Sequence, residues 1–215
     1  MDKKQVAATI DSTNLKANAS ENDIAKLCAD TVKYGFRGIC VNLGRLQFAG
    51  GQLLNKKIAV VVDFPLGAGG LAAKMNQTII AIGNGADEID PVINLGAFRD
   101  KRLYVIKREI QEISRILPAK AIIETGHWND REIAELAKLI ADTGAFAVKT
   151  STGMGPKVNL DDKARHVEIM KKAAPKLSVK AAGDIKTLAD AIKMINAGAD
   201  IIGTSSGAAM MEEEI

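Results

Sequence analysis

Two lysines stand in nearly matching surroundings, and as a pair they have the chemistry of an imine-forming site. Lys149, in AVKTSTG, and Lys180, in SVKAAG, each follow a valine in a short apolar run and precede small residues. An amine attacks a carbonyl only when unprotonated, whereas a free lysine is almost wholly charged at neutral pH. Burial and a second ammonium nearby both disfavour the charged form. One lysine would carry the imine and the other would stay charged; alternatively, each pairs with a carboxylate or reaches past a rim into solvent.

Carboxylates end other apolar runs, where they can supply the acid and base that carbon–carbon bond chemistry needs. Asp90, in GADEIDPVINLGA, is the candidate proton carrier. Asp11 follows the first apolar run, and Glu124 ends a later one. The competing interpretation of Asp90 is a salt bridge to one of the lysines, which does not exclude catalysis.

Two turns rich in small residues offer a place for an anion. They are AAGDIKT at 181–187 and GTSSG at 203–207, and each opens a stretch of helical pattern. Backbone N–H groups at the start of a helix can hold a phosphate through hydrogen bonds and the helix dipole. Because GTSSG is also an ordinary turn sequence, its weight comes from its place after the last predicted strand.

Parallel strands joined by helices would bring these distant residues to one edge. Eight apolar runs predict strands: Val6–Ile10, Gly38–Val41, Ile58–Val62, Glu88–Ile93, Ala121–Glu124, Phe146–Lys149, Val179–Ala181 and Ile201–Gly203. Apolar residues at three- and four-residue spacing predict helices at Glu21–Tyr34, Leu71–Asn84, Asp100–Leu117, Asp130–Thr143, Asp161–Ala174 and Leu188–Ala197. This alternation predicts an α/β protein, one (β/α)₈ TIM-barrel domain over residues 1–215. An open doubly wound sheet is the rival, but the GxGxxG that would favour it is absent after the first strand.

Composition limits the function. The chain is 47% hydrophobic and 26% charged, with 4% aromatic residues and a net charge of +3. Because no basic run is interleaved with aromatics, we expect no nucleic-acid partner. We expect a soluble cytoplasmic protein without membrane contact, since the apolar runs are strand-sized and no apolar leader is present. Two isolated histidines, His127 and His166, are too few for a common zinc site, so we expect no metal.

Eight segments resemble the deoxyribose-phosphate aldolase family along nearly the whole chain. They are IDSTNLK (10–16), GFRGICVN (35–42), FPLGA (64–68), GADEIDPVINLGA (85–97), IIETG (122–126), VKTSTG (148–153), VKAAG (179–183) and GTSSG (203–207). VKTSTG is the most specific, because it surrounds the Schiff-base lysine of that family. The resemblance implies a class I aldolase without metal or organic cofactor. Its reaction is the reversible cleavage of 2-deoxy-D-ribose 5-phosphate to acetaldehyde and D-glyceraldehyde 3-phosphate.

The resemblance also implies a role for each site residue. Lys149 would form the imine, and Lys180 would be the neighbouring cation that activates it and relays protons. Asp90 would handle protons with a bound water, and Asp11 would support Lys180. The phosphate would be held by residues of three turns: Thr152, Gly153, Gly183, Lys186, Gly203, Ser205 and Ser206. Members of the family are commonly dimers or tetramers, so we expect a homo-oligomer.

Asp184 is the departure with the largest consequence, because the family usually has a second glycine there. A carboxylate about 4 Å from a phosphate charge costs about 4 kcal/mol at an effective dielectric near 20. Asp184 would have to point away or pair with Lys186, which stands where the family often has arginine. Otherwise the protein is a related lysine-dependent aldolase with a different or unphosphorylated acceptor aldehyde. A third hypothesis, a non-catalytic sugar-phosphate-binding barrel, predicts that a catalytic lysine or aspartate is lost, yet all are present.

Overall fold

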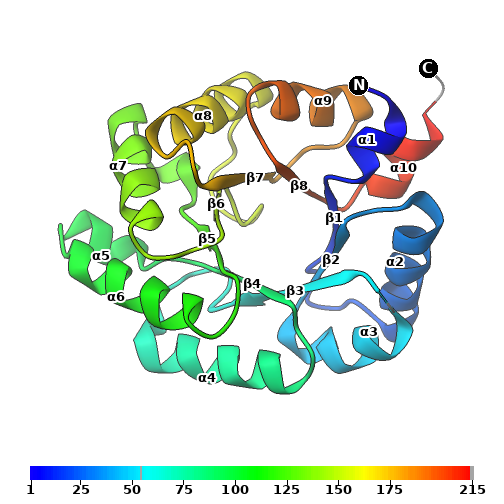
Figure 1. Ribbon diagram of the computed structural model, residues 1–215, viewed down its shortest axis with the longest axis horizontal. Coiled ribbons are helices and arrows are strands. Elements are labelled where there is room, and N and C mark those ends of the chain that lie inside the picture. Colours follow the sequence, from blue (N-terminus) through cyan, green and yellow to red (C-terminus); the bar gives the residue numbers. More distant parts are fainter. Residues whose placement is uncertain (54, 214–215) are drawn as a thin grey trace.

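The computed structural model describes residues 1–53 and 55–213, and its centre is an eight-stranded sheet (Figure 1). The strands are β1 (Ile10–Asn14), β2 (Gly38–Val41), β3 (Lys57–Val62), β4 (Glu88–Pro91), β5 (Lys120–Ile122), β6 (Ala147–Lys149), β7 (Ser178–Ala182) and β8 (Ile201–Thr204). They follow the order β4-β3-β2-β1-β8-β7-β6-β5, and the ladder partners are parallel. Parallel bridges from Ile89 to Ala119 and from Val92 to Ile122 join β4 to β5. The predicted (β/α)₈ barrel is confirmed.

Helices surround the strands on the outside of the barrel (Figure 1). They are α1 (Lys3–Ala7), α2 (Glu21–Tyr34), α3 (Leu46–Gln52), α4 (Gly70–Gly83), α5 (Leu95–Arg99), α6 (Leu103–Ser114), α7 (Asp130–Ala141), α8 (Leu160–Ala173), α9 (Leu188–Asn196) and α10 (Gly207–Glu212), with 3₁₀ turns η1 (Leu43–Arg45) and η2 (Thr125–His127). The six predicted helices correspond to α2, α4, α6, α7, α8 and α9. The four that were not predicted have seven residues or fewer, too few to show a helical period.

Local sequence signals explain where the helices begin and end. In α2, the Ser20 side chain accepts from the Asp23 N–H, and the Asp23 carboxylate accepts from the Ser20 N–H. This reciprocal cap satisfies two N–H groups that the helix itself cannot use. Gly35 ends the helix in a left-handed conformation, with φ at 72°, which a residue without a side chain adopts at little cost.

The first predicted strand is placed wrongly along the chain. The strand was expected at Val6–Ile10, but Lys3–Ala7 form α1, which begins at a reciprocal cap between Asp2 and Gln5. The apolar side chain of Val6 is buried from a helix rather than from a strand. β1 starts only at Ile10, so Asp11 is its second residue and is fully buried within the barrel.

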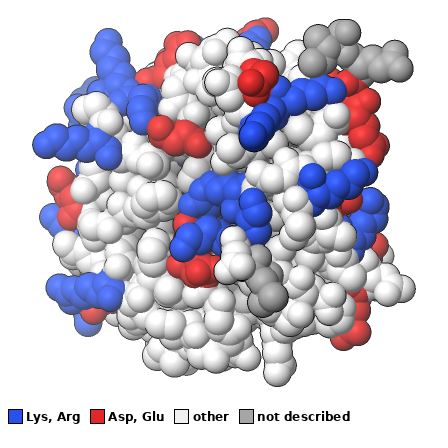
Figure 2. All heavy atoms as spheres, turned by 45° about the vertical axis from the view of Figure 1, so that its right-hand side comes forward, with Lys and Arg blue, Asp and Glu red and all other residues white. Residues whose placement is uncertain are grey.

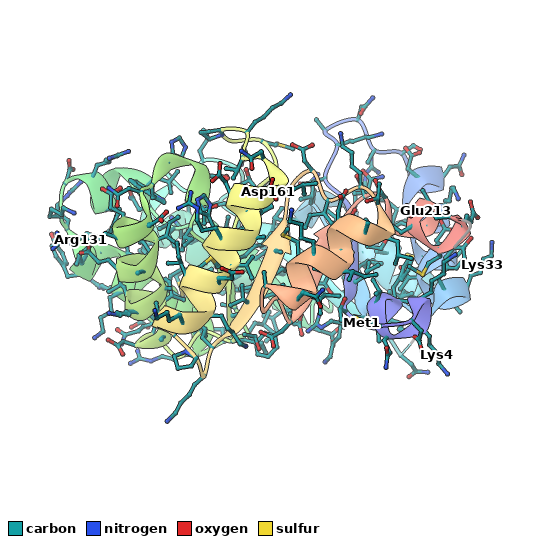
Figure 3. All side chains as sticks on the ribbon, turned by 90° about the horizontal axis from the view of Figure 1, so that it is seen from above. Met1, Lys4, Lys33, Arg131, Asp161 and Glu213 are labelled. Atoms are coloured by element: carbon teal, nitrogen blue, oxygen red, sulfur yellow. The ribbon has the colours of Figure 1, made fainter. Side chains whose placement is uncertain are left out.

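Side and surface views show where the labelled residues and the charged side chains lie. In Figure 3, Asp161 at the beginning of α8 lies toward the edge where the strands end, and Met1 and Lys4 lie toward the opposite edge. Figure 2 shows a group of basic side chains at the centre of the face that comes forward, with acidic side chains beside it and wide uncharged areas around it. Within residues 1–53 and 55–213, no helix has the length and apolar character needed to cross a membrane.

Candidate active site

Lys149 and Lys180 are neighbours on adjacent strands, and they share one carboxylate. They are register partners on β6 and β7, and their side chains are 3% and 0% exposed. The Lys149 ammonium lies 2.8 Å from Asp90 Oδ2, and the Lys180 ammonium lies 2.9 Å from the same oxygen. The barrel thus brings together three side chains that are separated by up to 90 positions in sequence.

Asp11 holds Lys180 from the other side. Its Oδ2 atom accepts a hydrogen bond of 2.6 Å from the Lys180 ammonium, and its Oδ1 atom accepts one of 2.8 Å from Arg37. Burial by itself raises the pKa of Asp11, but Lys180, Lys120 and Arg37 together hold that pKa below its usual value. Asp11 is therefore a buried carboxylate that stays ionised and fixes the position of the Lys180 ammonium.

A third buried lysine, Lys120 on β5, completes the cluster and was not predicted from the sequence. Its ammonium lies 2.8 Å from Asp90 Oδ1 and 2.8 Å from Glu88 Oε2. Glu88 in turn accepts two hydrogen bonds from the Arg37 guanidinium. The available signal was a lysine between alanines in an apolar strand, the same kind of setting that marked Lys149 and Lys180.

The charges in this cluster stabilise one another. Burial raises the pKa of Asp90, but Lys120, Lys149 and Lys180 outweigh it and hold that pKa well below its usual range. Burial lowers the pKa of Lys180, but Asp11 and Asp90 raise it above its ordinary value. Lys120 behaves in the same way, with Asp90 as its main stabilising partner. At neutral pH, Asp90 is therefore a carboxylate, and Lys120 and Lys180 are ammonium ions.

Counting charges shows what the cluster can do chemically. The hydrogen-bonded set has four basic groups and three carboxylates: Arg37, Lys120, Lys149 and Lys180 with Asp11, Glu88 and Asp90. Loss of one lysine proton makes the set neutral, which burial favours. Lys120 and Lys180 each contact two carboxylates closely, whereas Lys149 contacts one. Of these three lysines, Lys149 is the one that lines the cavity at the ends of β6, β7 and β8.

That cavity, of about 460 Å³, opens at the ends of β6, β7 and β8. All seven residues predicted to hold a phosphate line it: Thr152, Gly153, Gly183, Lys186, Gly203, Ser205 and Ser206. Gly153 and Gly183 face each other, since a Cβ on Gly153 would lie 3.7 Å from the Gly183 Cα. Both have positive φ, at 83° and 85°, which strains any residue with a side chain. These two turns therefore require glycine where they meet.

Three of the predicted residues have additional roles inside the protein. The Thr152 N–H and hydroxyl both donate to the buried Glu124 carboxylate, which anchors the turn after β6. The Ser206 N–H donates to the Thr204 hydroxyl at 2.9 Å. At Gly203, an added Cβ would come within 3.0 Å of the Lys180 Cε atom, so this glycine leaves room for the lysine. The four remaining residues are therefore best placed for direct hydrogen bonding to a ligand: Gly153, Gly183, Lys186 and Ser205.

Asp184 stands at the mouth of this cavity. Its φ of 52° is in the left-handed region, where a residue with a side chain is uncommon. The carboxylate is 55% exposed, and its nearer oxygen lies 3.7 Å from the Lys186 ammonium. The expected pairing with Lys186 is present, although an exposed ion pair of this kind contributes little to stability.

A larger cavity, of about 860 Å³, lies at the opposite end of the barrel. Its three basic lining residues are already engaged: Arg37 binds Asp11 and Glu88, Lys56 donates to the Phe36 carbonyl, and Lys57 lies 3.6 Å from Asp87. Active sites of such barrels lie where the strands end rather than where they begin. The cavity beside Lys149 is therefore the candidate active site.

Together, the fold and the cluster define a barrel enzyme with a buried lysine at its cavity. Residues 5–213 match the family model described as "DeoC/LacD family aldolase". A deoxyribose-phosphate aldolase of Thermococcus kodakarensis is 41% identical over an alignment of 223 positions, which covers 99% of this chain and 98% of that protein. The chain belongs to the DeoC/LacD aldolase family.

Two solved structures agree in fold. The one titled "QR15, an Aldolase" has a TM-score of 0.91 at 35% identity, with 96% of this chain and 94% of that chain covered. A deoxyribose phosphate aldolase from Aeropyrum pernix, described as having a unique tetrameric structure, has a TM-score of 0.88 at 30% identity, with 98% and 91% covered.

Proposed function

We propose that this protein is a deoxyribose-phosphate aldolase, which reversibly cleaves 2-deoxy-D-ribose 5-phosphate to acetaldehyde and D-glyceraldehyde 3-phosphate. The observation that carries the proposal is the placement of Lys149 at the cavity, in contact with Asp90 and beside Lys180. The name of the Thermococcus kodakarensis relative supports the substrate.

The proposed reaction starts at Lys149. Its neutral amine attacks the C1 aldehyde of the open-chain sugar, and loss of water from the carbinolamine leaves an imine. Removal of the C3 hydroxyl proton then breaks the C2–C3 bond, with the electron pair moving toward the imine nitrogen. D-glyceraldehyde 3-phosphate departs, and the remaining enamine takes a proton at its terminal carbon. Water hydrolyses the resulting imine, which releases acetaldehyde and restores the amine.

The rest of the cluster maintains the charges that these steps need. Asp90, held ionised by three lysines, accepts and returns protons through a water molecule, as general acid–base chemistry requires. Lys180 stays an ammonium ion and relays protons, and Asp11 fixes it in place. Lys120 keeps Asp90 oriented from its second oxygen. No step calls for a metal or an organic cofactor, so EDTA treatment should leave the rate unchanged.

The phosphate of the substrate would lie at the turns after β6, β7 and β8. Gly153, Gly183 and Ser205 offer backbone groups and a hydroxyl there, and Lys186 brings a positive charge. Asp184 motivates the second candidate function, cleavage of an unphosphorylated sugar by the same lysine chemistry.

One assay separates the two functions. Acetaldehyde release is measured from 2-deoxy-D-ribose 5-phosphate and from 2-deoxy-D-ribose under identical conditions, with Lys149→Met as the inactive control. We expect kcat/KM to be at least about tenfold higher with the phosphate, which corresponds to about 1.4 kcal/mol. Equal values for the two sugars would favour the second function, and no release from either would reject both.

We also propose one barrel domain over residues 1–215, a cytoplasmic location and a homo-oligomer. Cys28 and Cys40 are buried free thiols, which suits a reducing compartment. The Aeropyrum pernix relative, described as a tetramer, supports assembly. The small net charge of +3 and the low aromatic content of 4% support small-molecule partners rather than nucleic acid. Light scattering coupled to size-exclusion chromatography tests assembly, with a mass near 22.8 kDa as the contradicting result.

A further inference from the structure

One buried lysine outside the cluster has no carboxylate within ion-pairing distance among the residues that the structure describes. The structure buries five lysines: Lys74, Lys120, Lys149, Lys163 and Lys180. All but Lys163 form an ion pair with a carboxylate within 4.0 Å. Within residues 1–53 and 55–213, no such ion pair reaches Lys163, which is 2% exposed. A buried charge without a counter-charge is costly, so its retention calls for an explanation.

The contacts of Lys163 place it behind the candidate phosphate site. The residue lies on α8, two positions after Asp161, which Figure 3 labels at the end of the helix near the strand ends. Its ammonium donates a hydrogen bond to the Gly183 carbonyl. A Cβ on Gly183 would lie 3.4 Å from the Lys163 Nζ atom and 3.5 Å from the Gly153 Cα. The ammonium therefore packs against Gly183, one of the two glycines that meet at the cavity.

The surrounding charges only partly compensate for this burial. Burial lowers the pKa of Lys163, and the carboxylates of Asp184, Glu124 and Asp190 act against that effect from a distance. Glu124 is itself bound to Thr152, and Asp190 caps α9 by accepting from Thr187. Asp184 is mostly exposed and pairs loosely with Lys186. Each nearby carboxylate thus has another partner, and the site is short of one anion.

We propose that Lys163 is a positioning and specificity-determining residue for the phosphate group of the substrate. Its ammonium places positive charge behind the Gly153–Gly183 contact, and the incoming phosphate is the anion that this charge lacks in the free protein. The same charge offsets the repulsion from Asp184, so the cavity keeps its preference for a phosphate monoester. This inference rests on the proposed function, because it names how that substrate is recognised.

Three variants separate charge from packing. Lys163→Gln removes the charge but keeps a donor on a shorter side chain, Lys163→Met removes both, and Lys163→Arg keeps the charge. Lys172→Met, at an exposed position of the same helix, is the matched control. Each purified full-length variant is assayed with 2-deoxy-D-ribose 5-phosphate and with 2-deoxy-D-ribose.

We expect Lys163→Gln and Lys163→Met to raise KM for the phosphorylated sugar by about tenfold, the effect of one partly screened charge at short range. Their kcat should stay within about twofold, and kcat/KM for the unphosphorylated sugar should not change. Lys163→Arg should recover most of the loss. Equal losses on both sugars would show a purely structural role and overturn the inference, as would wild-type kinetics in Lys163→Gln.

A binding measurement keeps the test decisive if no sugar is cleaved. Inorganic phosphate is titrated into the wild-type protein and into Lys163→Gln while the melting temperature is recorded. Stabilisation of the wild type that is lost in Lys163→Gln supports the inference even where the proposed function fails. Equal stabilisation of both proteins, or none in either, rejects the inference while leaving an observed aldolase activity untouched.

Discussion

Replacing Lys120 by methionine tests the charge balance of the cluster beside Lys149. Lys120 is fully buried and binds Asp90 and Glu88 at 2.8 Å each. The variant leaves three basic groups against three carboxylates. A neutral Lys149 would then give the cluster a net negative charge in a buried position. We therefore expect Lys120→Met to impair the formation of the nucleophile although Lys120 never reaches the cavity.

The size of the effect follows from the contacts. The ammonium groups of Lys120 and Lys149 bind opposite oxygens of Asp90 at 2.8 Å each. For two unit charges about 6 Å apart at an effective dielectric near 20, the interaction is about 3 kcal/mol, or about two pH units. The acidic limb of the kcat/KM profile should move upward by about that amount, with a loss of about 10- to 100-fold at pH 7. Breaking a buried ion cluster costs about 3–5 kcal/mol of folding free energy. We expect a loss of folding free energy at the lower end of this range. In the variant, Asp90 still forms ion pairs with Lys149 and Lys180, and Glu88 still pairs with Arg37.

The assay is acetaldehyde release between pH 5 and about pH 10, combined with urea unfolding of the same preparations. Lys138→Met, at an exposed position of α7, is the control and should change the free energy of unfolding by about 0.5 kcal/mol or less. A uniform loss of rate at every pH would refute the charge argument, since it would indicate distorted packing alone. An unshifted profile with near wild-type rates would refute it as well.

Three further predictions concern the same site. In Gly203→Ala, the new Cβ would lie 3.0 Å from the Lys180 Cε atom and would displace that lysine. We therefore expect a lower kcat and a free energy of unfolding, measured in urea, that is lower by about 1–3 kcal/mol. A wild-type kcat would contradict this prediction. Asp184→Gly should lower KM for the phosphorylated sugar about three- to tenfold by removing a like charge, and an unchanged KM would place Asp184 clear of the phosphate. The pKa values of Asp11 and Asp90 are lower in the folded protein than in the unfolded chain, where they lie near 3.8. The two ionised carboxylates therefore contribute their full stabilisation of the fold only above that unfolded pKa. The free energy of unfolding should therefore fall as the pH drops below about 5, with a shallower fall in Asp90→Asn.

The barrel could be predicted because its strands are short, largely apolar runs and its longer helices repeat their apolar positions regularly. The error at Val6–Ile10 shows the limit, since five apolar and small residues fit a helix or a strand equally well. The reciprocal cap at Asp2 and Gln5 was visible in the sequence and would have decided for the helix.

The site could be predicted only where a residue stood near the end of a strand. Lys149, Lys180 and Asp90 did so, whereas Lys120 was placed just before its predicted strand and was overlooked. Lys163 lies on a helix, where its position four residues before Val167 puts it on the buried face. Its place behind the Gly183 turn depends on tertiary packing that no local pattern reveals.

The central claim is that Lys149 forms the covalent bond to the substrate, and trapping tests it most directly. The wild-type protein is incubated with acetaldehyde and reduced with borohydride, and its peptides are mapped by mass spectrometry. We predict a single stable ethyl adduct on the peptide that contains Lys149, and none in Lys149→Met. An adduct confined to Lys180, or no adduct at all, would contradict the mechanism.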